Sequence, residues 1–178
     1  FEWINMLLQR ENQEFGFTHG IAGHGMAYWL CQDFLQPDAM VGRLQQYAAD
    51  LVQHQQKDGS WIYKVIEKKV KKREGFATGV AVIIYFLLEY AHRYNDNDAM
   101  NAAQRGLVWL INKSEHKGQS IQWHSDKKKR LMHWWCEGTS GIALAFMKAY
   151  SVLGSPIFKQ YATGALLNHP FQVIDNNL

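Results

Sequence analysis

Four residues whose side chains can do chemistry recur at one level of a repeated pattern: His19, Thr78, Cys136 and Glu137. A histidine can transfer a proton near neutral pH, and a cysteine thiolate can bind a metal ion or act as a nucleophile. Cys136 follows two tryptophans and precedes Gly138, after which an apolar segment runs on. A helix start at this cysteine favours the charged thiolate. The pattern therefore indicates metal binding or catalysis at Cys136, with a small buried thiol as the alternative.

These residues recur because the chain repeats itself. Gly20, Gly79 and Gly138 are spaced 59 residues apart, and each one opens an apolar segment. We divide the chain, a single domain over 1–178, into hairpin units of about 16–74, 75–133 and 134–178. Each unit begins with a glycine-rich turn, continues as a nearly all-apolar helix and returns as an amphipathic helix.

The polarity of the helices predicts an all-α fold. A helix that is apolar all round is buried, whereas an amphipathic helix faces water on one side. Apolar helices are expected at 21–35, 80–94 and up to 153, and amphipathic helices at 39–55, 99–112 and 157–167. Units of this kind must stack to bury their faces. Inner helices wrapped by outer helices, as in an α/α barrel or toroid, satisfy this need and direct the repeated turns towards one cavity.

Several other residues are candidates for the same cavity. His24 lies one helical turn beyond His19, and His133 lies three positions before Cys136. A histidine on its own is more often part of a core than a ligand, and Cys31 is interpreted as a core residue. The sequence has no Cys-x-x-Cys and no His-Glu-x-x-His pattern, so it holds no complete metal motif.

Composition excludes several classes of protein. A net charge of +3 gives no indication of nucleic-acid binding, and no apolar run approaches the roughly 20 residues of a membrane span. The first residues do not resemble a signal peptide, and two cysteines do not form a disulfide framework. We expect a cytoplasmic protein. Basic runs at 68–73 and 127–130 are either solvated loops or a field that steers an acidic or peptidic substrate.

Two motifs resemble those of the lanthionine synthetase C-like (LanC-like) family. Residues 16–23 read Gly-Phe-Thr-His-Gly-Ile-Ala-Gly, similar to the family's G-x-x-H-G-x-x-G motif, and residues 135–142 read Trp-Cys-Glu-Gly-Thr-Ser-Gly-Ile, similar to W-C-x-G-x-x-G-I. The resemblance extends through the hairpin units over essentially the whole chain. It implies an α/α toroid of seven hairpins, of which this chain supplies three.

The resemblance also implies a function. Family members bind zinc through the Trp-Cys cysteine and a later Cys-His-Gly motif, and they add a peptide cysteine thiol to a dehydroamino acid to close a thioether ring. Carried over, Cys136 is a zinc ligand and His19 the catalytic proton donor. The expected substrate is a modified peptide, contacted by Trp135, His133, Thr78, His24 and Glu137. The other zinc ligands are expected beyond Leu178, since the chain reads as a fragment cut before that motif and holds no complete site.

Departures from the family pattern leave alternatives open. Thr78 stands where the histidine of the motif nearest to Trp-Cys belongs, and Met132 and His133 stand where an arginine or acidic residue is usual. Either His19 donates the proton from a neighbouring unit, or the protein lacks the acid. A non-catalytic binding scaffold is therefore one alternative function. An α/α-barrel carbohydrate enzyme is another, which requires paired carboxylates at the cavity.

Overall fold

The computed structural model describes residues 14–34, 37–66, 69–124 and 132–167. Its helices are α2 (Ile21–Leu30), the 3₁₀ turn η1 (Gln32–Phe34), α3 (Pro37–Gln53), α4 (Val80–Tyr94), α5 (Asn97–Asn112), α6 (Thr139–Leu153) and α7 (Pro156–Leu166). Two short antiparallel hairpins complete the fold: β1 (Lys64–Ile66) with β2 (Lys69–Lys71), and β3 (Glu115–Lys117) with β4 (Ser120–Gln122).

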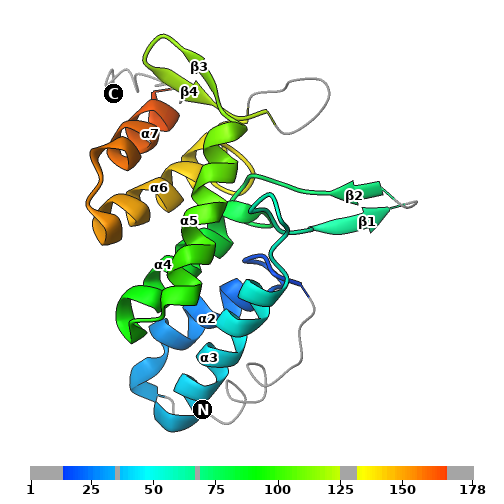
Figure 1. The fold of residues 1–178 in the computed structure, drawn as a ribbon, viewed down its shortest axis with the longest axis vertical. Coiled ribbons are helices and arrows are strands. Elements are labelled where there is room, and N and C mark those ends of the chain that lie inside the picture. The colour runs from blue at the N-terminus through cyan, green and yellow to red at the C-terminus, as the bar shows by residue number, and fades with distance from the viewer. Residues whose placement is uncertain (1–13, 35–36, 67–68, 125–131, 168–178) are drawn as a thin grey trace, which may run out of the picture.

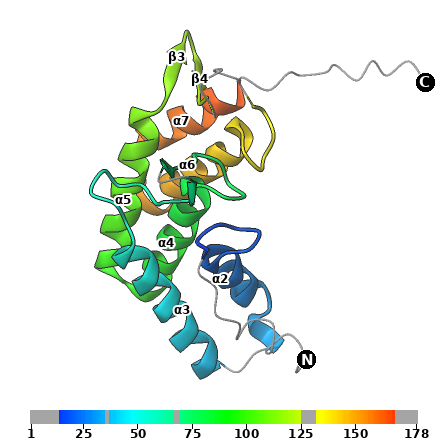
Figure 2. The same ribbon diagram turned by 90° about the vertical axis from the view of Figure 1, so that its right-hand side faces the viewer.

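The helices form three consecutive hairpins, α2–α3, α4–α5 and α6–α7, which stack along the long axis of the molecule (Figures 1 and 2). The first helices of the three hairpins lie side by side, with α4 in contact with both α2 and α6. The mainly helical structure confirms the all-α fold class. Closure into a toroid of seven hairpins stays a prediction. Among the described helices, none is long and apolar enough to cross a bilayer.

Helix α4 has the bounds that its apolar pattern predicted, and it is the centre of the core. Most of its side chains are buried, because α2, α5 and α6 all pack against it. Asn95 ends the helix in the left-handed conformation, with φ of 53°. The next residue, Asp96, caps α5 by accepting a hydrogen bond from the Ala99 amide at 2.8 Å.

The segments that follow α3 and α5 fold back onto those helices through a tryptophan side chain. The Trp61 indole donates to the Leu51 carbonyl at 2.7 Å, and the Trp123 indole donates to the Leu110 carbonyl at 2.8 Å. Each tryptophan thereby folds the chain back over the helix before it, and both are buried. A Cβ on Gly106 of α5 would lie 3.0 Å from the Trp61 ring, so this glycine gives the ring room to pack between units.

The structure departs from the sequence predictions at the end of α2 and in the segments that contain β2 and β3. Helix α2 ends at Leu30, with η1 in place of the expected extension to residue 35. Strand β2 lies within the basic run that was interpreted as a loop, and β3 precedes the turn at Gly118. These strands are only three residues long and rich in charged side chains, so they carry no period-two apolar pattern by which a strand is recognised.

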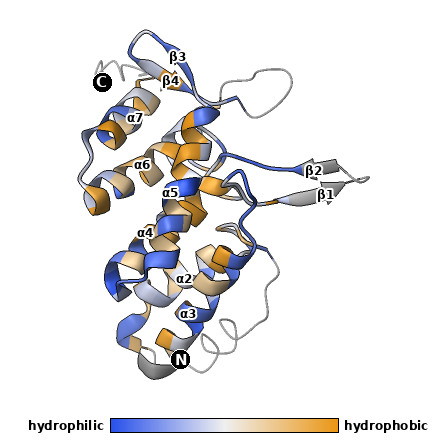
Figure 3. Ribbon diagram, in the orientation of Figure 1, coloured by the Kyte–Doolittle hydropathy of each residue, from blue (hydrophilic) through white to orange (hydrophobic). Residues whose placement is uncertain are grey.

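Helix α6 is rich in apolar residues (Figure 3), and several of its large apolar side chains are exposed among the described residues. Met147 and Tyr150 are 52% and 40% exposed, whereas Leu88 and Ala91, which occupy the same positions in α4, are buried. Helix α4 has an inner helix on each side, and α6 has one on one side only among the described helices. The repeat thus explains why these side chains are apolar although water reaches them.

The glycine-rich turns before α2, α4 and α6 stack on one another through their backbones. The Phe17 amide donates to the Ala77 carbonyl at 2.8 Å, and the Ala77 amide donates to the Cys136 carbonyl at 2.6 Å. We call these turns the first, second and third motif loops (residues 16–20, 75–79 and 134–138). Gly75 allows the close approach, since a Cβ there would lie 2.6 Å from the Glu137 Cα and 2.8 Å from the Cys136 oxygen.

Replacing Gly75 with alanine should therefore lower the free energy of unfolding by about 1–3 kcal/mol, the usual cost of overpacking. The matched control is Gly42→Ala in α3, where a Cβ would meet nothing within 4 Å. This control should be stabilising by about 0.5–1 kcal/mol, because alanine is the better helix former. Urea unfolding measures both values, and equal effects of the two substitutions would contradict the packing of loop on loop.

The first residue of α6, Thr139, is completely buried, and its hydroxyl has no hydrogen-bond partner among the described residues. The same position is Val80 in α4 and Ile21 in α2. An unpaired buried hydroxyl is destabilising, and valine has nearly the same shape as threonine. Thr139→Val should raise the free energy of unfolding by about 1 kcal/mol, whereas Thr163→Val on the exposed side of α7 should change it little. A loss of stability in Thr139→Val would show that the hydroxyl has a partner.

Candidate functional site

Three aromatic rings bring the motif loops together at one point. Phe17, Phe76 and Trp135 occupy the same position in the three units, and each ring contacts the other two. The centroid distances are 6.0 Å between Phe17 and Phe76, 6.4 Å between Phe76 and Trp135, and 5.9 Å between Phe17 and Trp135. The first and third loops therefore meet although the second lies between them in the sequence.

Cys136 is a half-buried free thiol beside this aromatic cluster. The sequence predicted that Cys136 stands at the start of a helix. This is wrong, because α6 begins only at Thr139. Gly138 is the N-cap, with φ of −113° and ψ of −171°, so the extended backbone at Gly138 separates the cysteine from the helix. The dipole of α6 therefore acts on Cys136 less directly than a position in the first turn would allow.

The residue after the cysteine, Glu137, is held by Thr78 of the second motif loop and by Arg73, which lies just before that loop. The Thr78 hydroxyl donates to Glu137 Oε1 at 2.5 Å, and Arg73 Nη1 donates to the Thr78 hydroxyl at 3.2 Å. The same Arg73 nitrogen lies 3.5 Å from Glu137 Oε1, within ion-pair distance. Thr78 and Glu137 are 59 residues apart, so this bond joins equivalent positions of adjacent units.

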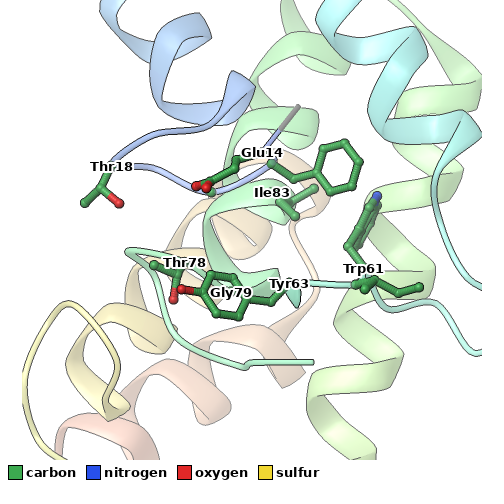
Figure 4. A pocket seen from close by; sticks show the side chains of 10 residues that line it. Glu14, Thr18, Trp61, Tyr63, Thr78, Gly79 and Ile83 are labelled. Atoms are coloured by element: carbon green, nitrogen blue, oxygen red, sulfur yellow. The ribbon is translucent and has the colours of Figure 1, made fainter. Parts of the chain in front are cut away.

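Two small pockets lie at the junctions between successive motif loops. The first pocket has the first and second loops on opposite sides, and Figure 4 shows Glu14, Thr18, Tyr63 and Thr78 among its walls. The second pocket is lined by Arg73, Glu74, Gly75, Met132 and Glu137. Thr78 thus lines one pocket, and its two hydrogen-bond partners line the other.

The second pocket holds two carboxyl groups in unlike surroundings. Burial raises the pKa of Glu74, and the nearby Glu137 carboxylate acts in the same direction. Glu137 has Thr78 and Arg73 as partners, which suit its charged form. A carboxyl that keeps its proton to higher pH, as Glu74 does, can donate that proton.

Of the other residues expected at the site, two lie in the motif loops and two lie outside them. His19 is exposed in the first motif loop, and Trp135 is about half exposed in the third. The His133 carbonyl accepts a hydrogen bond from the Ser140 hydroxyl at 2.6 Å, which ties the start of the third loop to α6. The His24 ring is 6.4 Å from the Tyr47 ring of α3, and burial lowers its pKa.

The basic runs are only partly described. In the first, Lys72 pairs with Asp58 at 2.6 Å, and Arg73 lies over the Tyr63 ring at 4.2 Å from its centroid. Residues 67–68 and the whole run 127–130 lie outside the described residues. Lys72 and Arg73 are thus engaged in specific contacts of the fold.

Neither Arg73 nor Tyr63 was predicted from the sequence to lie at the site. Arg73 was one of several cations in a basic run, and nothing in its local pattern sets it apart. The repeat could have indicated that Thr78 and Glu137, the partners of Arg73, contact each other. These two residues occupy equivalent positions in loops that must stack. Complementary polar side chains at such positions are expected to meet.

The thiol of Cys136 is a donor of the type that zinc prefers. Among residues 14–34, 37–66, 69–124 and 132–167, however, no three His, Cys, Asp or Glu side chains are grouped so that they could hold a metal ion. A zinc ion at Cys136 therefore needs further ligands from outside the described residues. The donor chemistry of Cys136 fits zinc, and among the described residues no complete ligand set accompanies it.

Comparison with known proteins supplies the family. No curated protein matches the chain significantly. The family model for lanthionine synthetase C-like proteins matches residues 3–169, which include all three motif loops. A match over this length covers the whole stack of helical hairpins. The chain belongs to the lanthionine synthetase C-like family.

Proposed function

We propose that this protein is a zinc-dependent LanC-like protein that forms thioether rings by adding a peptide cysteine thiol to a dehydroamino acid. The observation that carries the proposal is the family match together with the position of Cys136. This residue is the cysteine of the Trp-Cys motif, it is a free and partly accessible thiol, and it lies where the three motif loops meet.

The proposed reaction is the addition of a thiol across a carbon–carbon double bond, followed by protonation. The chemistry that zinc supplies when bound is deprotonation of a substrate thiol near neutral pH. A sulfur–carbon bond then forms at the β-carbon of the dehydroamino acid, and its double-bond electrons move to give an enolate. The α-carbon takes up one proton, for which we assign the His19 imidazolium as donor. No oxidant or reductant is needed.

The first and third motif loops support this assignment by their placement. Contact between Phe17 and Trp135 brings the loop of His19 against the loop of Cys136. The exposure of His19 and Trp135 leaves both side chains accessible to a peptide. A peptide lying over the aromatic cluster would therefore have its reacting cysteine near Cys136 and the proton donor on the first-loop side.

A non-catalytic LanC-like scaffold is the second candidate, and Thr78 is the observation that favours it. The Thr78 hydroxyl is committed to Glu137, and threonine is not an acid near pH 7. The scaffold and the cyclase share the fold and the metal, and they differ in turnover. A cyclisation assay on a dehydrated peptide separates them.

Cys136→Ala should abolish stoichiometric zinc in the full-length protein, because a three-ligand site that loses its thiolate cannot hold the ion tightly. Cys31→Ala is the matched control, since Cys31 is also a free, half-buried thiol but lies at the end of α2. Zinc is measured by elemental analysis against protein concentration. Metal-free wild type, or unchanged zinc in Cys136→Ala, would refute zinc dependence.

His19→Ala should slow cyclisation of a dehydrated peptide by about 10²-fold or more, the usual contribution of a general acid. Zinc content should stay the same, because His19 is assigned to proton transfer alone. His54→Ala is the control, as His54 is exposed near the end of α3. If His19→Ala cyclises the peptide at the wild-type rate, the proton comes from elsewhere.

A further inference from the structure

The contacts around Glu137 point to a role for the second motif loop, and for the arginine just before it, in setting the position of the Cys136 thiol. We propose that Thr78 and Arg73 are positioning residues: by holding the Glu137 carboxylate they fix the backbone of the third motif loop, and with it the thiol of Cys136. This inference rests on the proposed function, in which Cys136 is the residue that must be placed accurately.

The first step of the argument is that Glu137 has little freedom. Its side chain is 19% exposed, and one oxygen receives the Thr78 hydroxyl and faces Arg73. Hydrogen bonds to an ionised group are stronger than those between neutral groups. The carboxylate is therefore anchored to a loop of the preceding unit.

The second step is that Arg73 is itself fixed. Its guanidinium lies over the Tyr63 ring at 4.2 Å from the centroid and donates to the Thr78 hydroxyl. Tyr63 in turn donates its amide to the Lys71 carbonyl at 2.9 Å, next to the β1–β2 hairpin. Stacking on an aromatic ring and donation to oxygen constrain the plane of the guanidinium. The cation is thus held before any substrate arrives.

The third step connects Glu137 to the cysteine. Cys136 is the preceding residue, and its carbonyl accepts the Ala77 amide at 2.6 Å. The second loop therefore holds the backbone at Cys136 and the side chain at Glu137, on both sides of the peptide bond between them. Because the carbonyl of Cys136 and the side chain of Glu137 are both held, the Cα–Cβ bond of Cys136 has a fixed direction. Only rotation about that bond remains free.

This geometry gives Thr78 a function in place of the histidine that the family motif has there. A threonine hydroxyl can accept from Arg73 and donate to Glu137 at the same time. A valine of the same shape can do neither. Serine keeps the hydroxyl and should keep the function.

The test compares the alkylation rates of two cysteines in the same molecule. Full-length wild type, Thr78→Val, Thr78→Ser and Arg73→Gln are treated with iodoacetamide, and the modification of Cys136 and Cys31 is followed by peptide mass spectrometry. Cys31 serves as the internal reference because it is a free, half-buried thiol distant from the cluster. Lys72→Gln is the matched control, since it breaks the neighbouring ion pair with Asp58 without touching Glu137.

We expect the rate ratio of Cys136 to Cys31, measured with a chelator present, to rise about tenfold in Thr78→Val and Arg73→Gln, the change expected when a hydrogen bond to a charged group is lost. Thr78→Ser and Lys72→Gln should stay near the wild-type ratio. An unchanged ratio in both Thr78→Val and Arg73→Gln, or a Thr78→Ser ratio as high as that of Thr78→Val, would overturn the positioning role. A purely structural role would raise both cysteines together and leave the ratio constant.

The same experiment separates this inference from the proposed function. Wild type is also alkylated with its metal as purified, and bound zinc should protect Cys136 and leave Cys31 unaffected. Absence of protection in wild type counts against the zinc site. It leaves the comparison among the chelated variants standing, because that comparison needs no metal.

Discussion

The backbone hydrogen bonds that Ala77 makes to the first and the third motif loop hold the candidate site together. Its carbonyl accepts from the first motif loop and its amide donates to the third, so one residue of the second loop joins all three. These bonds require the loop backbones to approach closely, which the glycines of the motifs permit. The aromatic cluster, the Thr78–Glu137 bond and the position of Cys136 all depend on this stacking.

The repeat explains which parts of the fold the sequence could predict. Helix α4 has its predicted bounds because an apolar segment between two turn signals has few alternatives, and the all-α class follows from the polarity of the helices. Residues 61–66, which contain β1, are expected from the sequence to be at best a short extended segment, whereas β2 and its pairing with β1 were missed because β2 is short and charged. The start of α6 was placed too early because tryptophan and cysteine are as apolar as the helix that follows, and only the extended backbone at Gly138 marks the boundary.

The 59-residue repeat predicts that equivalent positions of the motif loops lie near one another, but it does not predict which residue outside the loops joins them. The spacing of His19, Thr78 and Glu137 indicated one level of the structure, and Phe17–Trp135 contact brings the first and third loops together. The pairing of Arg73 with Glu137 joins residues far apart in the chain, and no local pattern reveals it. In the sequence Thr78 was the residue that stands in place of a histidine; in the structure its hydroxyl joins Arg73 to the carboxylate beside the reactive cysteine.

The central claim is that Cys136 binds zinc and that the stacked loops hold it in place to do so. X-ray absorption at the zinc edge of the full-length protein tests it most directly, because it reports the ligand atoms themselves. The account predicts a zinc–sulfur shell at about 2.3 Å in wild type and in Cys31→Ala, and loss of this shell together with the bound zinc in Cys136→Ala. A spectrum with only nitrogen and oxygen neighbours, or a sulfur shell that survives Cys136→Ala intact, would contradict it.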